Sequence, residues 1–422
     1  MTDRKKQSYG LKTIISRISA IAAIYTVFAA INLSAGSSVS GKVQDSSSNN
    51  LPDINVKVVG TQNKTVTDVN GDFKLDIGNS KRVNLYFSAK GYYSKTSSGV
   101  KPDAKVAVKL KPIANDDGFI KYIEPISMSH SVTWLRAKDR NRLDSKVDEK
   151  TFEEMVKKYG EADKEQVVFR IRFPENGKKV KAIFLISEHG IGQYLLESKK
   201  TWKFADKNDL ALIGVIGNPI QRGIYPNSYL DGIIADIGKK YKHPELATVP
   251  VITFGHSNGT GFSAFYAASN PDRTIGWISY HSGGRWHLEF PGVEKSPGLV
   301  MHGMKDIFFK GQEKSIDMLR TKRDAAVCMT MEPFVAHWPA DRDATYDFLF
   351  EFCEACLRKP MNKNGVDLKS GWLGSRYDKA KGGVQKPEIA PYAEFKGDRN
   401  NANWMPDEKF AKVWQTYRSK AK

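Results

Sequence analysis

A Gly-His-Ser-Asn-Gly sequence at residues 255–259 contains the residues of this chain that could do chemistry most directly. The mostly apolar run 249–254 precedes it, and small residues follow it from Thr260 onwards. A strand that turns sharply into a helix holds the serine between them in a strained backbone conformation, and the glycines on either side leave room for the turn. The pattern therefore predicts that Ser257 is a nucleophile exposed at the end of a strand.

A serine hydroxyl needs a neighbouring base to remove its proton and an acid to orient that base. Asp306 follows the apolar run 298–301, and His337 follows the apolar run 325–331. Because the carboxyl ends of strands meet at one edge of an open α/β sheet, we expect Ser257, Asp306 and His337 to lie together there. In this arrangement His337 is the base and Asp306 orients its ring.

Other residues compete for these roles. Asp341 and Asp343 are rival acids, but they follow His337 so closely that capping of a helix suits them better. Four further histidines suit a turn, the wall of a pocket or simple packing better than the role of base: His256, His281, His287 and His302.

Acyl transfer also requires hydrogen-bond donors aimed at the developing oxyanion. The apolar run 182–186 leads into a loop in which Gly190 and Gly192 flank Ile191, although the loop lacks a run of consecutive glycines. We predict that the backbone N–H of Gly190 or Ile191 is the first donor. The second would be the N–H of Asn258, directly after the nucleophile.

Three residues near these segments could contact a substrate. Trp286 and Trp338 offer aromatic surfaces on which a sugar or a phenolic acyl group could stack. Arg285 could pair with a carboxylate on such a substrate. Each of the three is equally compatible with a rim position that has no special role.

The pattern of apolar and polar residues along the chain predicts the strands and helices that position these residues. From Gln166 to residue 360, strands alternate with helical stretches, which predicts a doubly wound, mostly parallel α/β sheet covered on both faces. Residues 113–165 are charged and predict a linker with one helix over 148–159. Residues 361–422 predict an irregular C-terminal extension that packs on the catalytic domain through Trp372, Trp404 and Trp414.

Residues 39–112 have a different pattern, in which apolar and polar residues alternate in short runs separated by turn residues. Asn70-Gly71 is a strong hairpin signal, and no helical stretch intervenes, so the segment predicts a small all-β sandwich. Asp68, Asn70 and Asp72 could hold calcium, but a hairpin turn explains them without a metal. The predicted strands are 39–43, 54–59, 64–68, 72–75, 83–89 and 105–110.

Two resemblances to known families agree with these predictions. Residues 39–112 resemble the carboxypeptidase regulatory-like, transthyretin-like domain in Ser40-Gly41-Lys42-Val43, in the segment 67–73 and in Gly91-Tyr92. That family is a non-catalytic module, and the resemblance covers nearly the whole segment.

Residues 166–358 resemble the α/β-hydrolase superfamily, in particular its esterase, feruloyl esterase and polyester depolymerase branch. The resemblance rests on the sequence 255–259, on His302-Gly303 to Asp306, and on His337. It implies a Ser257-His337-Asp306 triad that acts through an acyl-enzyme, with no metal and no organic cofactor.

The N-terminal residues predict export. Five basic residues precede an apolar run over 18–31, which gives way to Leu33-Ser34-Ala35. This is typical of a cleaved secretory signal peptide, although an uncleaved anchor stays open. We therefore expect residues 1–35 to be removed, a mature chain that begins near Gly36, no stable membrane span after cleavage, and a location outside the cell or in its envelope.

Charge and cysteine content limit the partners. The formal net charge of +18 favours association with polyanions, but the basic residues are spread along the 422-residue chain without an Arg-rich arm or a helix-turn-helix pattern, so nucleic acid is not an expected partner. Three cysteines, Cys328, Cys353 and Cys356, cannot form a disulfide framework. Buried thiols suit them best, and a single bridge from Cys328 to Cys353 stays open.

Three functions fit the sequence. The first is a secreted serine esterase that hydrolyses carboxylic esters linked to carbohydrate or plant cell wall, such as acetyl or feruloyl esters. The second is a serine peptidase of the same fold, which would need a domain that gates the substrate or a pocket for a peptide terminus, and the β-sandwich is too small to be such a gate. The third is a non-catalytic polysaccharide-binding protein, against which the set Ser257, Asp306 and His337 argues.

Overall fold

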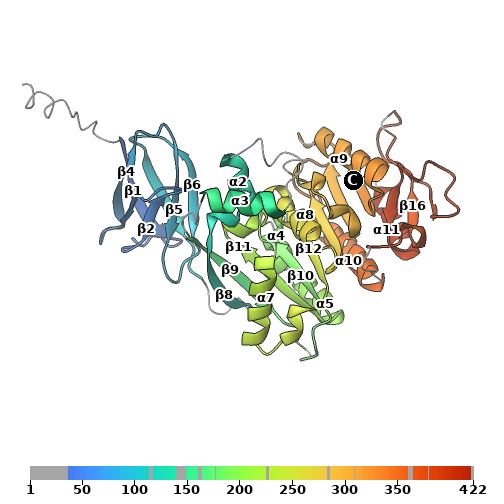
Figure 1. Cartoon of the computed structure of the whole chain (residues 1–422), viewed down its shortest axis with the longest axis horizontal. Coiled ribbons are helices and arrows are strands. Elements are labelled where there is room, and N and C mark those ends of the chain that lie inside the picture. The colour runs from blue at the N-terminus through green and yellow to red at the C-terminus, as the bar shows by residue number, and fades with distance from the viewer. Residues whose placement is uncertain are drawn as a thin grey trace, which may run out of the picture. The chain divides into compact units, whose positions relative to one another are not determined.

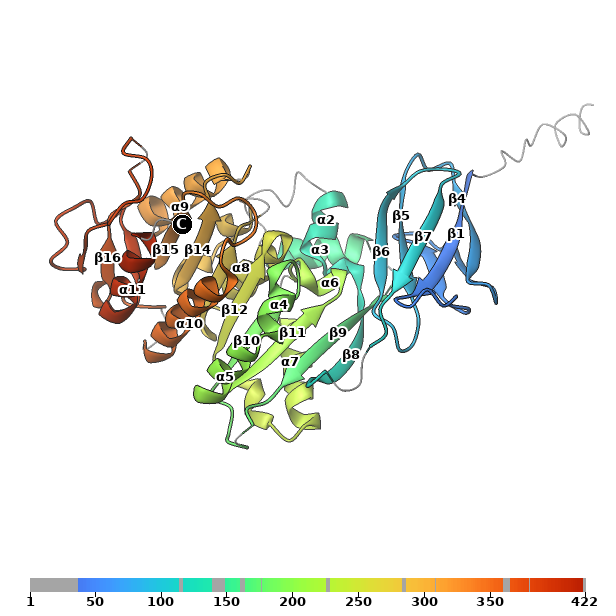
Figure 2. The ribbon, with the colours of Figure 1, turned by 180° about the vertical axis from the view of Figure 1, so that it is seen from behind.

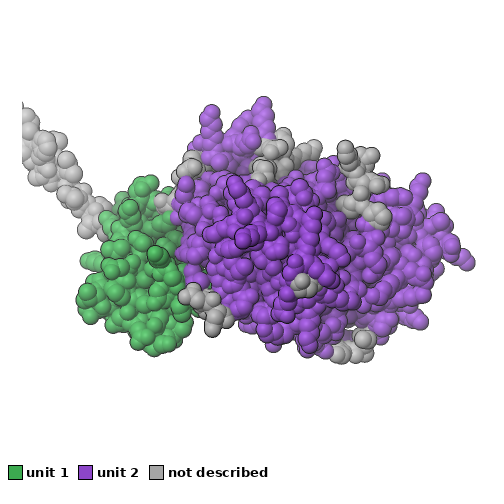
Figure 3. All heavy atoms as spheres, turned by 90° about the horizontal axis from the view of Figure 1, so that it is seen from below, with its two compact units in different colours: residues 1–112 green, residues 113–422 purple. Residues whose placement is uncertain are grey.

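The structure is a computed structural model, and it describes residues 37–113, 117–138, 149–159, 164–175, 177–224, 228–282, 286–307, 309–359, 365–378 and 380–419. The chain divides into two compact units, Met1–Pro112 and Ile113–Lys422, which Figure 3 shows in different colours. The predicted signal peptide, residues 1–35, lies outside the described residues.

The first unit is the predicted β-sandwich. One sheet has the strand order β4-β1-β7 and the other β3-β2-β5-β6. Alternation is clear in β4, where Phe73, Leu75 and Ile77 are buried and the residues between them are exposed. The strand β6 was not predicted, because its sequence KTSSGV lacks apolar alternation. The strands are β1 (Ser37–Asp45), β2 (Asn55–Val58), β3 (Lys64–Val66), β4 (Asp72–Gly78), β5 (Val83–Ser88), β6 (Lys95–Val100) and β7 (Lys105–Leu110).

The carboxylates of the turn between β3 and β4 bind other groups of the protein itself. Oδ1 of Asp68 accepts the backbone N–H groups of Asn70 and Asp72, each at 2.9 Å, and Asp72 pairs with Lys42 at 3.0 Å. A hairpin therefore accounts for this acidic sequence, as the turn signal indicated.

The second unit is built on an eight-stranded sheet with the order β15-β14-β13-β12-β10-β11-β9-β8. The six strands from β15 to β11 run parallel, while β9 is antiparallel to both β11 and β8. The predicted doubly wound, mostly parallel sheet is confirmed, and its arrangement is that of an α/β-hydrolase. The strands are β8 (Ile120–Ser127), β9 (Lys164–Arg172), β10 (Ala182–Ser187), β11 (Leu210–Ile216), β12 (Val251–His256), β13 (Thr274–Tyr280), β14 (Gly298–Gly303) and β15 (Val327–Glu332).

Helices cover both faces of this sheet, which Figures 1 and 2 show from opposite sides. One face packs against α4, α5, α10 and α11, and the other against α6, α7, α8 and α9. The central strands are buried on both faces, which explains their continuous apolar runs. The helices are α2 (Val132–Lys138), α3 (Glu149–Tyr159), α4 (Ile191–Glu197), α5 (Lys199–Lys207), α6 (Asn218–Gln221), α7 (Ser228–Lys240), α8 (Thr260–Ser269), α9 (Phe309–Arg323), α10 (Arg342–Arg358) and α11 (Glu408–Arg418).

The segment 113–165 is more than the predicted linker. Its helix α3 lies where the sequence indicated, but residues 120–127 form β8, the edge strand of the large sheet, in register with β9. Most of β8 is partly or fully exposed, and Pro125 interrupts its sequence. An edge strand of this kind tolerates proline and gives only a weak apolar signal.

The C-terminal segment is also more regular than predicted. It forms a small sheet of β16 (Trp372–Gly374), β17 (Ile389–Pro391) and β18 (Asn403–Met405), followed by α11. Trp404 and Trp414 are fully buried, and Nε1 of Trp414 donates to Oγ1 of Thr330 on β15 at 3.1 Å. The segment therefore completes the core beside β15, and Trp372 packs partly buried against the same core.

All three cysteines are free and buried, with Cys328 on β15 and Cys353 and Cys356 on α10. Burial raises the pKa of the Cys328 thiol to about 12. None of the helices in the described ranges combines the length and the hydropathy that a membrane span requires.

Candidate active site

Ser257 occupies a sharp turn between β12 and α8. Its backbone φ is +54°, a left-handed conformation that a non-glycine residue adopts only under constraint. The turn also explains its two glycines. A Cβ on Gly255 would lie 2.0 Å from the carbonyl oxygen of Gly259, and a Cβ on Gly259 would lie 2.7 Å from Oγ of Ser187. This segment has the geometry of a nucleophile elbow.

Asp306 and His337 form a short hydrogen bond. Nδ1 of His337 donates to Oδ2 of Asp306 at 2.6 Å. Asp306 follows the end of β14, and His337 lies in the loop after β15. The carboxylate is 2% exposed and the imidazole 31% exposed, so the acid is shielded while the ring remains accessible. A buried carboxylate bound to Nδ1 fixes the tautomer of the ring and leaves Nε2 as its basic nitrogen.

His256, the residue before Ser257, links these two parts of the site. Nε2–H of His256 donates to the backbone carbonyl of His337 at 3.0 Å, and the two imidazole rings lie 4.9 Å apart. Within the described residues, Oγ of Ser257 has no hydrogen-bond partner. The structure thus brings Ser257, His337 and Asp306 to one edge of the sheet, at the carboxyl ends of β12, β14 and β15.

His256 is held as a neutral ring, because both of its nitrogens have partners. Nδ1 accepts the backbone N–H of Ile191 at 3.2 Å, while Nε2 donates to His337. Burial lowers the pKa of His256 from its ordinary 6.5 to about 3. The side chain therefore acts as a fixed bridge between the loop after β10 and the loop that carries His337.

This bridge changes the expected set of oxyanion donors. The N–H of Ile191 was predicted as a donor, but it is engaged by His256 and is not free for a substrate. The loop is tightly packed here, since a Cβ on Gly190 would lie 1.8 Å from Nδ1 of His256. The N–H groups of His189 and Gly190 have no acceptor within the described residues. They are the free donors of this loop.

Asn258 lies at the start of a short 3-10 helix, η3 (Ser257–Gly259), that leads into α8. The first N–H groups of a helix have no intrahelical acceptor, so the N–H of Asn258 is available to an oxyanion. His189 lies close to this turn, because its Cβ would be 3.2 Å from a Cβ on Gly259. Burial, followed by the positive charge of Arg222, lowers the pKa of His189 below its ordinary value.

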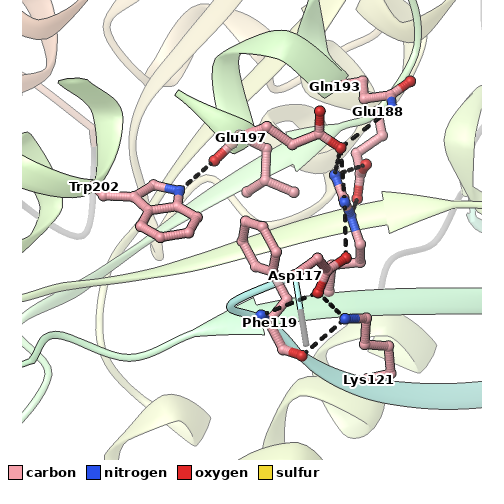
Figure 4. A network of polar contacts seen from close by, with 9 residues as sticks. Asp117, Phe119, Lys121, Glu188, Gln193, Glu197 and Trp202 are labelled. Carbon is pink, nitrogen blue, oxygen red and sulfur yellow. Dashed lines mark hydrogen bonds and ion pairs between the residues drawn. The ribbon is translucent and has the colours of Figure 1, made fainter. Parts of the chain in front are cut away.

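A buried ion pair fixes the start of the loop that carries these N–H groups (Figure 4). Nη2 of Arg170 lies 2.7 Å from Oε2 of Glu188, and Nε of Arg170 donates to Oε1 at 3.0 Å. The two side chains are only 3% and 1% exposed. Glu197 of α4 also accepts from the same guanidinium at 2.8 Å. Since Glu188 directly precedes His189, the pair fixes the start of the donor loop.

A second polar network reaches the site from the C-terminal helix. Oε2 of Glu332 accepts from Nε2 of His281 at 2.7 Å, and Oε1 accepts from the hydroxyl of Tyr417 at 2.8 Å. His281 has a positive φ of +42°, and its ring lies 6.4 Å from that of His337. Neither Glu332 nor Tyr417 was predicted. A charged residue at the end of the apolar run 325–331 was the only signal for Glu332.

The remaining rivals have structural partners. Asp341 caps α10 and accepts the N–H of Ala344 at 3.0 Å, as expected from its position. Nδ1 of His302 donates to the carbonyl of Gly303 at 3.3 Å, and burial lowers the pKa of His302 to about 4. Nε2 of His287 lies 3.3 Å from Oγ of Ser282. In the part of the chain that the structure describes, no group of His, Cys, Asp or Glu side chains is arranged to hold a metal ion.

The structure describes one of the three side chains that were predicted to contact a substrate. Trp338 is 54% exposed beside His337, and its ring lies 5.1 Å from that of His256. Arg285 and the side chain of Trp286 lie outside the described residues. The sequence did not indicate Tyr194 or Arg342, which line a cavity together with Trp338. They lie far apart in the chain, and neither belongs to a motif.

Parts of the chain are similar to a known domain family and to solved structures. The CarboxypepD_reg-like domain family matches residues 39–116. No curated protein sequence matches the chain. A cohesin–X-dockerin complex from Acetivibrio cellulolyticus is 19% identical over 18% of this chain, with a TM-score of 0.17, and the match spans 58% of that chain.

Two hydrolases also match by structure. S-formylglutathione hydrolase (FrmB) from Staphylococcus aureus is 12% identical over 46% of this chain and 93% of its own, with a TM-score of 0.35. Est1E from Butyrivibrio proteoclasticus is 13% identical over 46% of this chain and 96% of its own, with a TM-score of 0.33. Residues 39–116 belong to the CarboxypepD_reg-like domain family, and the second unit has an α/β-hydrolase fold by its own strand order.

Proposed function

We propose that this chain is a serine hydrolase that cleaves carboxylic esters, with Ser257 as nucleophile, His337 as base and Asp306 as the acid that orients the base. The observation that carries the proposal is the 2.6 Å bond between His337 and a buried Asp306, at the sheet edge where Ser257 has a left-handed backbone. Such an arrangement activates a hydroxyl that is otherwise a weak nucleophile.

The geometry supports a two-step reaction. His337 takes the proton of Ser257 as the hydroxyl attacks the ester carbonyl, and then gives it to the departing alcohol. The N–H of Asn258 and a free N–H of the loop at His189 and Gly190 stabilise the oxyanion. Water then attacks the acyl-enzyme with His337 again as base, which releases the acid and restores Ser257.

We assign the substrate to esters linked to carbohydrate, such as acetyl or feruloyl groups on a plant cell-wall polysaccharide. Exposed Trp338 beside His337 supports this class, because an indole surface suits a sugar or a phenolic ring. Export through residues 1–35 belongs to the same proposal, since polymeric substrates are met outside the cell. N-terminal sequencing of the exported protein, with a start near Gly36 expected, tests that part.

The first experiment compares the mature protein with Ser257→Ala on 4-nitrophenyl acetate and on acetylated and feruloylated xylan fragments. We expect kcat/KM on every active ester to fall by several orders of magnitude in the variant, as for removal of a triad nucleophile. Ser269→Ala, at the end of α8, is the matched control and should retain activity. Equal rates for Ser257→Ala and the unmodified protein, or inertness of both on all esters, would refute the proposal.

A further inference from the structure

Beside the proposed catalytic residues lies a cavity of about 330 Å³ whose walls come from two separate segments. Tyr194 belongs to α4, the helix that begins directly after the oxyanion loop. Trp338, Pro339, Ala340 and Arg342 belong to the segment that follows His337. The cavity therefore lies between the parts of the chain that carry the proposed oxyanion donors and the proposed base.

The cavity presents two large aromatic side chains to solvent. Trp338 is 54% exposed and Tyr194 is 49% exposed. Single exposed aromatic residues are common on protein surfaces, but two that line one cavity next to a nucleophile provide an apolar wall for a ring. The ring of Trp338 is held on its inner side, where it lies 5.1 Å from the ring of His256.

Arg342 adds a positive charge to this wall. Its guanidinium lies over the ring of Tyr194, 5.1 Å from the ring centre, and the residue is exposed. Within the described residues, Arg342 forms no ion pair, and the neighbouring Asp341 uses its carboxylate to cap α10. A guanidinium stacked on an aromatic ring keeps its in-plane N–H groups free, and those groups fit the two oxygens of a carboxylate.

From these observations we infer that the site prefers esters that carry a carboxylate near the reacting group, such as acetyl esters on an oligosaccharide with a uronic acid branch. The inference rests on the proposed function, because it places the substrate at Ser257. The sugar ring packs on Trp338 and Tyr194, while the carboxylate accepts from Arg342. The formal net charge of +18 favours the approach of such an acidic substrate.

The test uses matched pairs of esters. One pair is acetylated xylo-oligosaccharides with and without a glucuronic acid branch, which places the carboxylate on the alcohol side. The other is 4-nitrophenyl butyrate and the 4-nitrophenyl half-ester of succinic acid, which places it on the acyl side. We expect the unmodified protein to show a higher kcat/KM on the acidic member of at least one pair, mainly through KM.

The variants are Arg342→Gln and Arg342→Lys. In Arg342→Gln the preference for the acidic member should fall about tenfold, and Arg342→Lys should retain part of it, since a point charge remains without the planar fork. Arg399→Gln is the matched control, because Arg399 is also exposed and stacked on a tyrosine, Tyr392, outside the cavity. That control should retain the full preference.

The inference is overturned if the unmodified protein shows no preference for the acidic member of either pair. It is also overturned if Arg342→Gln lowers kcat/KM on acidic and neutral members by the same factor. Should no ester be hydrolysed, the proposed function fails, and calorimetric titration with acidic and neutral xylo-oligosaccharides tests the carboxylate preference by binding alone. Equal affinities in that titration would exclude it as well.

Discussion

The carboxylate of Asp306 is 2% exposed and the imidazole of His337 that it binds is 31% exposed. The pair thus has one side shielded from water and one side open to it. Because water is excluded from the acid, its hydrogen bond to Nδ1 is stronger than a surface pair would be. This asymmetry favours a ring with a fixed tautomer and an accessible Nε2, which the proposed role of His337 as base requires.

Replacement of the acid should leave the protein folded but slow the reaction. We expect Asp306→Asn to lower kcat on 4-nitrophenyl acetate by about 10³- to 10⁴-fold, because an amide does not hold the required tautomer of His337. Steady-state kinetics at pH 7.5 measure this. Asp343→Asn changes an exposed acid in the first turn of α10 and should retain activity. A loss in Asp343→Asn similar to that in Asp306→Asn would contradict the assignment.

Addition of one methyl group at Gly190 should damage both stability and activity. Gly190 has φ +60°, and a Cβ there would lie 1.8 Å from Nδ1 of His256. We expect Gly190→Ala to reduce the free energy of unfolding by about 2 to 5 kcal/mol, from backbone strain and overpacking, and to lower kcat by displacing His256. Urea unfolding and kinetics check the two effects.

The control for that substitution is Gly232→Ala. Gly232 lies in α7, where a Cβ would meet no atom within 4 Å. Alanine has a higher helix propensity than glycine, so this variant should be as stable as the unmodified protein or more stable by up to about 1 kcal/mol. Equal destabilisation of the two variants would show that the close contact at Gly190 has no special cost.

Burial of His256 should make folding sensitive to mild acid. Its pKa is lowered to about 3 in the folded protein and is near 6.5 when unfolded, so the unfolded chain binds the extra proton between these values. Stability from this group is present above pH 6.5 and is lost as pH falls, by about 2 kcal/mol between pH 7 and pH 5. The free energy of unfolding in urea at both pH values, compared with His256→Asn, measures the difference. Equal losses in both proteins would count against a neutral, buried His256.

Removal of the charge on Glu188 should destabilise the second unit. Glu188→Gln leaves the guanidinium of Arg170 buried with Glu197 as its main remaining partner, and we expect a loss of about 2 to 4 kcal/mol. The donor loop after Glu188 should also become less well fixed, so kcat on 4-nitrophenyl acetate falls. Glu175→Gln removes a 78% exposed partner of Arg172 and should cost less than about 1 kcal/mol. A ranking in the opposite order would contradict the role given to the buried pair.

The sequence predicted those parts of the fold that have a local signal. The apolar runs of β10, β12 and β14 mark buried parallel strands, and the glycines at 255 and 259 mark the turn that positions Ser257. The edge strand β8 has no such signal, because most of its residues are exposed and Pro125 lies within it. The three-residue strands of the C-terminal segment are likewise too short for a period to be recognised.

Contacts between distant segments could not be predicted in the same way. The engagement of the Ile191 N–H by His256 joins residues 65 positions apart, so the sequence alone offered Ile191 as a free donor. Arg170 and Glu188 gave a partial signal, because Arg170 lies within the mostly apolar run 167–171 and Glu188 directly follows the apolar strand β10. Such a residue is rarely buried without a partner of opposite charge, but the sequence does not identify that partner.

The three buried thiols can be used to measure local opening of the folded protein. Cys328 lies at the start of β15, and Cys353 and Cys356 lie in the last turns of α10, so all three are at the end of these elements away from the loop that carries His337. Burial raises the pKa of each thiol. A thiol that is both inaccessible and protonated reacts slowly with alkylating reagents. The rate of alkylation under native conditions therefore reports how often this end of the sheet opens, without any added label.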